Sequence, residues 1–275
     1  MTPPAVSVLM SVRDGAPWVL DAVQSVLDQS EADLELIVID DGSVDGTPAL
    51  LGAVRDPRLR VERRPPAGLT PSLNRAIELA RAPLLARLDA DDVALPERLA
   101  RQKRFLDAHP EVGLLGTGAR EVDAAGRAVG LVTPPADDLG IRRALIRRNP
   151  FVHSSVLMRR RVIDEVGGYD PAMPVAQDYE LWMRMSRVTR LANLPEPLVV
   201  RRLLPGRVSS ARDGERLSAE ALVRWRAVRS GLYPWWCVVF LVRPLAARLV
   251  PRGVRARLRH RLAPPRPVPP AGVAR

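Results

Sequence analysis

The first third of the chain alternates between short aliphatic runs and amphipathic segments, and this alternation constrains the fold more than any other feature. Short runs rich in Val, Ile and Leu are typical of buried strands, whereas apolar residues three and four positions apart indicate helices. The pattern predicts strands at 6–12, 34–39, 58–62 and from 84 onward, separated by helices at 17–27, 45–54 and 69–81. Strands and helices in this order build an α/β fold, with a mostly parallel central sheet flanked by helices.

Carboxylates follow two of the predicted strands. The strand from Leu84 ends in Asp89, Asp91 and Asp92, and the strand at 34–39 ends in Asp40 and Asp41. In such sheets ligands bind beyond the carboxyl ends of the strands. Asp89 and Asp91 can converge on one point because alternate residues of an extended segment face the same side. Their hard oxygen ligands suit Mg²⁺ or Mn²⁺ carrying phosphate oxygens, rather than zinc. The alternative is that these acids only end a strand and cap the next helix; their presence at two strand ends favours a ligand site.

A dinucleotide-binding domain is the first competing interpretation, because an acid after the second strand could hold a ribose. Such a domain needs a glycine-rich turn after its first strand, where the backbone approaches a pyrophosphate. The corresponding turn at 11–16 contains one glycine. The sequence therefore argues against a dehydrogenase and predicts that a metal and arginine side chains meet any diphosphate charge.

The second half of the chain contains a histidine in an apolar segment and an acid at a helix start. The pattern predicts helices at 96–108, 137–148 and 177–184, a strand at 112–117 and a turn at 124–126. A single histidine in an apolar strand, such as His153, is more often a hydrogen-bonded core residue than a ligand. Asp178 opens a helix, where the macrodipole favours a carboxylate. From the residues alone, Asp178 is either a functional acid or a helix cap.

A series of motifs then occurs in a familiar order. They are Val6-Ser-Val8, Ser25-Val-Leu-Asp-Gln29, Leu36-Ile-Val-Ile-Asp-Asp-Gly-Ser43, Leu73-Asn-Arg-Ala-Ile77, Arg87-Leu-Asp-Ala-Asp-Asp92, Pro96-Glu-Arg-Leu99, His153-Ser-Ser155, Gly167-Gly-Tyr-Asp170 and Gln177-Asp-Tyr-Glu-Leu-Trp182. Each motif is weak alone, but the ordered set is specific. Over about 6–210 the chain resembles the inverting family-2 glycosyltransferases of the GT-A fold.

The resemblance implies a role for each matching residue. Asp178 would be the catalytic base, while Asp89 and Asp91 match the DXD motif, with Asp91 the favoured direct ligand of Mg²⁺ or Mn²⁺. The other candidate site residues divide into a donor-binding group and a group on the acceptor side or orienting its neighbours. The donor-binding group is Asp40, Asp41, Arg75, Asp89, Ser11 and Arg13, and the second group is His153, Trp182 and Gln177.

Several positions depart from the family pattern. The first turn carries Ser11 and Arg13 where the family often has proline and tyrosine-asparagine, and Gln177 stands where an acid often precedes the catalytic aspartate. Leu204 replaces a late histidine that helps hold the metal in many members. We therefore expect weaker metal binding, or a neighbouring arginine that meets part of the diphosphate charge.

The positive charge of the chain is concentrated at its end. The net charge is +11, but residues 221–275 contain twelve arginines and no acid, so residues 1–220 carry −1. An aromatic and apolar run at 231–242 is too short to span a bilayer and is followed by arginines, as in segments that lie at a membrane interface. Nucleic acid is a weaker interpretation, because the tryptophans precede the arginines and no recognition motif is present. The single Cys237 excludes an intrachain disulfide and a cysteine-based zinc site, and fits a reducing compartment.

The sequence thus predicts three regions. A glycosyltransferase domain covers 1–210, with a nucleotide-sugar half at about 1–118 and an acceptor half at about 119–210. A helical, aromatic and arginine-rich segment at 211–262 would meet an anionic membrane surface, and a disordered proline-rich tail would cover 263–275. The start of the chain lacks a signal-peptide pattern, so we expect a cytoplasmic enzyme, with attachment to the inner face of the plasma membrane as a further expectation.

The expected activity is inverting transfer of a sugar from a nucleotide-diphosphate sugar, with a UDP-sugar favoured, to a hydroxyl of a glycan or lipid-linked glycan. One alternative is a catalytically degenerate nucleotide-sugar-binding scaffold at the membrane, motivated by Gln177 and Leu204. Another is a nucleotidyltransferase, although the Gly/Lys-rich first loop usual in that class is absent. We expect no nucleic-acid partner.

Overall fold

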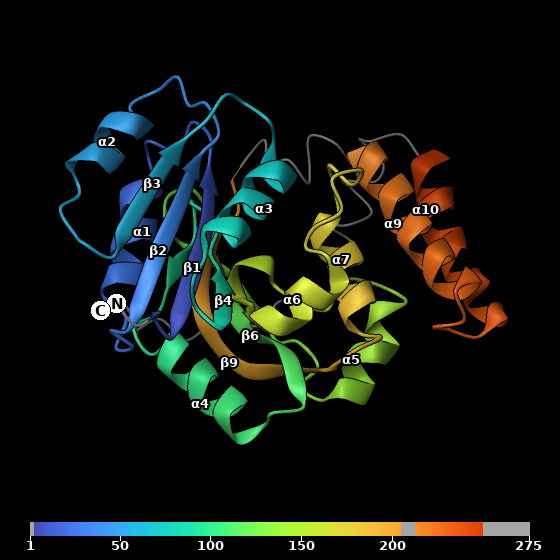
Figure 1. The fold of residues 1–275 in the computed structure, drawn as a ribbon. Helices are drawn as coiled ribbons and strands as arrows, with labels where there is room; N and C mark the ends of the chain where they lie inside the picture. Colours follow the sequence, from blue (N-terminus) through green and yellow to red (C-terminus); the bar gives the residue numbers. More distant parts are fainter. Residues whose placement is uncertain (1–2, 205–212, 250–275) are drawn as a thin grey trace.

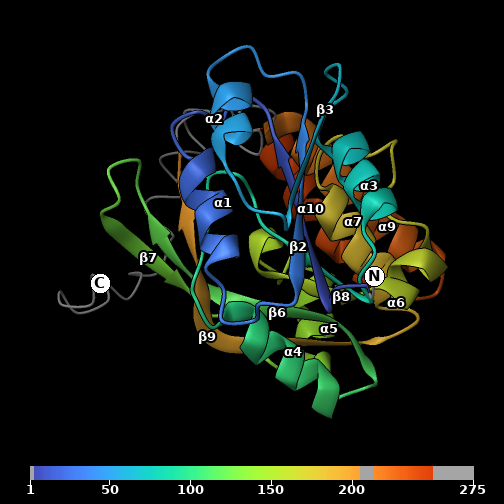
Figure 2. The ribbon, with the colours of Figure 1, turned by 60° about the vertical axis from the view of Figure 1, so that its left-hand side comes forward.

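A nine-stranded sheet forms the centre of the molecule in the computed structural model, which describes residues 3–204 and 213–249. Its strand order is β3-β2-β1-β4-β8-β6-β9-β5, with β7 paired to β6. Helices cover both faces of the sheet (Figures 1 and 2), so the predicted α/β architecture is confirmed. The predicted disordered tail at 263–275 lies outside the described residues.

The first half of the sheet is parallel and follows the sequence pattern. The strands are β1 (Val6–Val12), β2 (Leu34–Asp40), β3 (Leu59–Arg63) and β4 (Leu84–Arg87), and the helices between them are α1 (Val19–Leu27), α2 (Thr47–Ala53) and α3 (Leu69–Leu79). Each begins and ends within two residues of its predicted range, apart from the acid-bearing end of the last strand. In β1, Val8 and Met10 pack into a core on one face, whereas Leu9 packs into a core on the other. These strands are apolar on both sides because helices cover both sides.

The second half of the sheet is mixed in direction. Its strands are β5 (Val93–Ala94), β6 (Val112–Val122), β7 (Ala128–Val132), β8 (Leu157–Arg159) and β9 (Arg190–Arg202), and its helices are α4 (Arg98–Ala108), α5 (Asp138–Leu145), α6 (Arg160–Val166) and α7 (Gln177–Met185). β8 pairs antiparallel with both β4 and β6, and so joins the two halves. The predicted helices and the hairpin turn are present.

The sequence pattern missed β9, the longest strand. Pro195 and Pro197 interrupt its aliphatic run, and the ladder with β6 shifts register beside Gly118 to accommodate them. His153 is also not in a strand, because 153–155 form a short 3₁₀ turn before β8. The hydroxyl of Ser155 supports this turn by donating to the carbonyl of Val152 at 2.9 Å.

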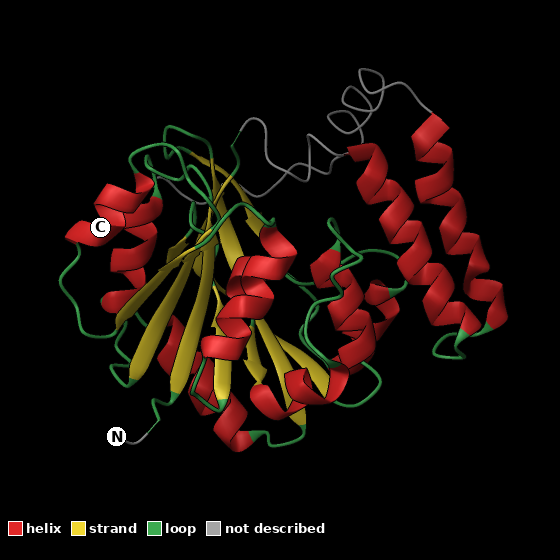
Figure 3. Cartoon of the chain, turned by 45° about the horizontal axis from the view of Figure 1, so that its top comes forward, coloured by secondary structure: helices red, strands yellow, loops and turns green. Residues whose placement is uncertain are grey.

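Two helices follow the sheet as a hairpin. α9 (Asp213–Arg229) packs on α7, and a 3₁₀ segment, η2 (Trp235–Val238), leads into α10 (Val239–Leu249), which packs on α9. Figure 3 shows this hairpin beside the α/β body. Across the described residues, none of the helices is long and apolar enough to cross a membrane.

Candidate functional site

Three carboxylates gather at the carboxyl end of β4. One oxygen from each of Asp89, Asp91 and Asp92 lies within 4.8 Å of the others. Asp92 is fully buried, and the other two are partly exposed. Like charges this close repel, so the cluster favours a cation or a proton.

Two side chains hold Asp89 in place. The buried Arg87 donates from Nη2 to Asp89 Oδ1 at 2.5 Å, and its Nη1 donates to the carbonyl of Leu9 in β1 at 3.2 Å. Ser154 Oγ lies 2.6 Å from Asp89 Oδ2 and accepts from the Asp89 backbone N–H at 3.2 Å. Sequence reasoning assigned no role to Arg87 or Ser154. The signals were the i, i+2 spacing of Arg87, the last residue of β4, and Asp89, and the position of Ser154 within the His-Ser-Ser motif.

Asp92 faces inward. Its Oδ2 lies 2.5 Å from Ser154 Oγ, and its Oδ1 accepts from the backbone N–H of Arg202 at 2.9 Å. Burial raises the pKa of Asp92 to about 7, and the charges of Asp89 and Asp91 add to the rise. The alternative that these acids cap the next helix is wrong for Asp92, because α4 has no side-chain cap.

The cluster fits a hard divalent cation. Its donors are all carboxylate oxygens, which Mg²⁺ and Mn²⁺ prefer. The two histidines within the described ranges, His109 and His153, are not part of it. Arg202 reaches the cluster through its backbone, but its guanidinium lies 4.4 Å from the ring centroid of Trp18 and pairs with Asp21 at 3.0 Å.

The acids after β2 are both buried, and they differ in what they bind. Asp41 accepts from the backbone N–H groups of Ala67 and Gly68 at 2.7 and 2.9 Å, and from the hydroxyl of Ser72 at 3.2 Å. Asp41 therefore ties the end of β2 to the start of α3. Asp40 Oδ1 accepts from the backbone N–H of Ser43 at 2.9 Å. Its Oδ2 lies 3.6 Å from Arg63 Nε and has no hydrogen-bond partner in the described part of the chain.

The remaining predicted donor residues lie on β1 and α3. Ser11 lies beside Ile39 of β2, and Arg13 is exposed, 4.0 Å from Asp14. Arg75 is held by Glu62 at 2.8 Å and by Glu78 at 2.9 Å, and these hydrogen bonds raise its pKa. Arg75 would have to exchange these acids for a diphosphate.

Asp178 is the second residue of α7 and lies in its first turn. Asn149 Nδ2 donates to Asp178 Oδ2 at 2.6 Å. The amide of Asn149 is itself oriented, because its Oδ1 accepts from the backbone N–H of Phe151 at 3.1 Å. Ala176 has a left-handed φ of 56°, a strained conformation for a non-glycine residue that often occurs at functional sites. Sequence reasoning missed Asn149, which belongs to none of the motifs.

The partly buried His153 lies near both Asp178 and the acids after β4. His153 Nε2 lies 2.9 Å from the hydroxyl of Tyr169, and its ring meets Trp182 edge-on at 6.2 Å. Burial lowers the pKa of His153 and Arg87 lowers it further, whereas Asp178 and Asp89 oppose the change. A neutral His153 therefore lies within electrostatic reach of both carboxylates.

The other two residues predicted for the acceptor side come from α7. Gln177, its first residue, is buried, and so is Trp182. The indole Nε1 of Trp182 has no hydrogen-bond partner among the residues described. Gln177 and Trp182 lie on the helix that carries Asp178, as the sequence predicts. Their part in acceptor binding stays a prediction.

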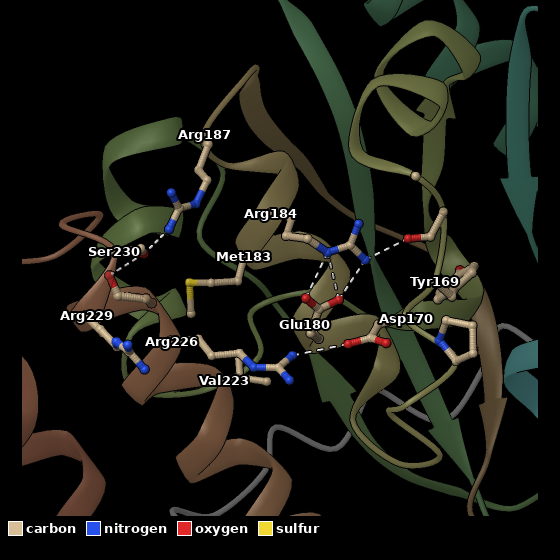
Figure 4. A pocket seen from close by; sticks show the side chains of 14 residues that line it. Tyr169, Asp170, Glu180, Met183, Arg184, Arg187, Val223, Arg226, Arg229 and Ser230 are labelled. Atoms are coloured by element: carbon tan, nitrogen blue, oxygen red, sulfur yellow. Dashed lines mark hydrogen bonds and ion pairs between the residues drawn. The ribbon is translucent and has the colours of Figure 1, made fainter.

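A separate cavity of about 790 Å³ lies between α7 and α9 (Figure 4). Tyr169, Glu180, Arg184 and Arg226 are among its lining residues, but Asp178 and the acids after β4 are not. It is therefore distinct from the carboxylate site.

Comparison with known proteins places this chain in a family. The family model described as glycosyl transferase family 2 matches residues 7–167. The putative glycosyltransferase EpsE of Bacillus subtilis is 28% identical over 262 residues, covering 92% of each chain. The amylovoran biosynthesis glycosyltransferase AmsE of Erwinia amylovora is 32% identical over 193 residues, covering 67% of this chain and 69% of AmsE.

Solved structures of low sequence identity share the fold. S. aureus TarS 1–349 in complex with UDP-GlcNAc has a TM-score of 0.70 at 19% identity, covering 87% of this chain and 71% of TarS. The mannosyltransferase PcManGT from Pyrobaculum calidifontis, in complex with GDP-Man and Mn²⁺, has a TM-score of 0.63 at 20% identity. The match covers 96% of this chain and 81% of PcManGT. With the family match over more than half of its residues, the chain belongs to glycosyltransferase family 2 and has the GT-A fold.

Proposed function

We propose that this glycosyltransferase moves a sugar, with inversion, from a nucleotide-diphosphate sugar to a hydroxyl of a glycan or lipid-linked glycan. The observation that carries the proposal is the presence of two carboxylate sites, the acids after β4 and Asp178, both near enough to His153 for Asp89 and Asp178 to affect its pKa. Such an arrangement suits a reaction in which a diphosphate leaves one face of the sugar while a hydroxyl attacks the other.

Asp178 would accept the proton of the attacking hydroxyl. A base must lie on the face opposite the leaving group, and the first turn of a helix is a favourable place for an acidic side chain. Asn149 would keep this carboxylate in one orientation through its 2.6 Å hydrogen bond. Transfer in one displacement needs no covalent enzyme intermediate, so the configuration of the sugar would invert.

Asp91 and Asp89 would hold Mg²⁺ or Mn²⁺, with Asp89 fixed by Arg87 and Ser154. When bound, the cation would stabilise the charge that develops on the departing diphosphate. Asp40 would offer the nucleoside its Oδ2, which accepts no hydrogen bond from the described residues, near Ser11 and Arg13 at the start of the site. Arg75 would complete this donor side, and Asp41 would support it by holding the start of α3 in place.

A UDP-sugar is the favoured donor, in line with the UDP-GlcNAc complex of TarS. Because PcManGT forms a complex with GDP-Man, GDP-sugars should be tested as donors as well. The name of AmsE assigns that protein to amylovoran biosynthesis, which is in line with a glycan acceptor here. We infer that transfer takes place in the cytoplasm, where nucleotide sugars are made.

The test is a thermal-shift screen of UDP- and GDP-sugars with and without Mn²⁺, because a ligand that binds only the native state raises its melting temperature. We expect one nucleotide class to raise Tm more when Mn²⁺ is present, and Asp91→Ala to remove the metal-dependent part. NMR of the product should then show the inverted anomer. A retained anomer would contradict the single-displacement scheme, and donor binding without transfer would favour the scaffold alternative.

A further inference from the structure

The second arm of the α9–α10 hairpin, formed by η2 and α10, leaves large apolar side chains exposed to solvent. Trp235, Trp236, Val239 and Val242 are 80%, 55%, 56% and 61% exposed, and we call these four side chains the Trp235 surface. Residues 235, 239 and 242 recur at the spacing of one helix face. Exposed apolar side chains that cluster in this way mark interaction sites on soluble domains.

This surface is held on an ordered support. On the inner side of the same segment, Cys237 and Leu241 are buried where η2 and α10 contact α9. The buried Arg224 of α9 donates to the carbonyl of Phe240 at 3.1 Å. The hydroxyl of Tyr233, just before η2, donates to the carbonyl of Arg142 in α5 at 2.8 Å. The exposure of the Trp235 surface is therefore a feature of the packed fold.

Arginines that line the cavity between α7 and α9 place positive charge near the C-terminal end of α9, just before η2. Its lining carries four arginines and two acids, a formal charge of +2. Arg184 pairs with Glu180 at 2.6 Å, and Arg226 pairs with an aspartate at 3.1 Å. Arg187 donates to the hydroxyl of Ser230 (Figure 4).

Arg229 is the remaining arginine of the cavity. It forms no hydrogen bond or ion pair with any residue that the structure describes. Arg187 and Arg229 thus keep charge that no carboxylate neutralises in this part of the molecule, and both are placed to meet an external anion.

The sequence around the hairpin extends this charge. Residues 221–275 contain twelve arginines and neither aspartate nor glutamate. An apolar, tryptophan-rich surface within such a segment is complementary to an anionic bilayer, where aromatic rings lie at headgroup depth and arginines meet phosphates.

Other occupants fit less well. A second copy of the chain would double the positive charge of a segment that has no acid of its own, which disfavours a symmetric interface here. Nucleic acid would leave the aliphatic Val239 and Val242 without a partner. The described part of α10 is too short to span a bilayer, because its eleven residues extend only about 16 Å, against about 30 Å of hydrocarbon.

We propose that the Trp235 surface inserts into the headgroup region of an anionic bilayer, with Arg187 and Arg229 directed at lipid phosphates. The hairpin would hold the enzyme against the membrane without crossing it. This inference does not depend on the proposed sugar transfer, and its test measures lipid binding alone.

The full-length protein is floated with phosphatidylcholine vesicles that contain or lack phosphatidylglycerol. Binding should require the anionic lipid and weaken with added salt, and tryptophan emission should shift to the blue. The double variant Trp235→Ser/Trp236→Ser should bind at least about tenfold more weakly, because the side chains that enter the interface are gone. Arg229→Glu should bind anionic vesicles more weakly at low salt, where headgroup attraction is least screened.

Leu139→Ser on α5 is the matched control, since Leu139 is 57% exposed but lies outside the hairpin. It should bind as the unmodified protein does. Unchanged melting temperatures would show that all variants fold. The proposal is overturned if the protein ignores anionic vesicles, if the double variant binds normally, or if the tryptophan substitutions change only the oligomeric state measured by sedimentation.

Discussion

The hydroxyl of Ser154 is predicted to control metal affinity. It lies 2.6 Å from Asp89 Oδ2 and 2.5 Å from Asp92 Oδ2, and it is almost fully buried. Ser154→Ala would leave these carboxylates without the group that spaces and orients them. Because Asp89 would then sample other rotamers, the cluster should bind Mn²⁺ less well.

The size of the effect follows from the contacts that are lost. Hydrogen bonds to charged groups contribute about 1.5–3 kcal/mol each, and removing a partner that orients a metal ligand typically weakens metal affinity about 10–100-fold. We therefore expect the apparent Kd for Mn²⁺ to rise about 10–100-fold, which corresponds to about 1.4–2.8 kcal/mol. Saturating metal should restore most of the transfer rate.

The adjacent serine provides a matched control. Ser155 is equally buried, but its hydroxyl donates to the carbonyls of Val152 and Thr117 and contacts no carboxylate. Ser155→Ala should lower stability and leave Mn²⁺ affinity unchanged. Affinity is read from the Mn²⁺ dependence of Tm and from the Mn²⁺ dependence of the transfer rate. Equal apparent Kd values for Mn²⁺ in Ser154→Ala, Ser155→Ala and the unmodified protein would refute the reasoning.

Two further variants test the acceptor side and the sheet. Asn149→Leu should slow transfer by up to about 100-fold with little change in the donor KM, because Asp178 loses its orienting hydrogen bond; steady-state kinetics separates the two parameters. Glu35 is buried, which raises its pKa, but hydrogen bonds from Ser7 and Arg81 outweigh burial and lower the pKa below 4.5. The stabilisation it gives is present above pH 4.5 and lost as the pH falls through the lowered value. Glu35→Gln should therefore cost about 1–3 kcal/mol at neutral pH and progressively less in acid, as urea unfolding would measure.

The parallel half of the sheet could be predicted because its strands are uninterrupted and buried on both faces. β2 illustrates this, since every one of its residues from Leu34 to Asp40 is buried. β9 could not be predicted, because Pro195 and Pro197 oppose a strand pattern and its pairing with β6 depends on residues far away in the sequence. Local periodicity carries no information on such long-range pairing.

The acids of the site could be found from their position at strand ends, but not the side chains that orient them. Ser154 and Asn149 reach Asp89 and Asp178 across gaps of 65 and 29 residues. Sequence reasoning also treated Asp40 and Asp41 as equivalent, whereas Asp41 binds the start of α3 and Asp40 keeps one oxygen without a hydrogen bond from the described residues. Only the folded arrangement separates these roles.

The most direct test of the account is to compare donor binding and transfer in Asp178→Asn, using the nucleotide sugar and cation identified by thermal shift. The substitution keeps the shape of the side chain but removes the base. We predict donor affinity close to that of the unmodified enzyme and transfer at least about 100-fold slower at every Mn²⁺ concentration. Full transfer by Asp178→Asn would contradict the central claim that this residue accepts the proton of the acceptor hydroxyl.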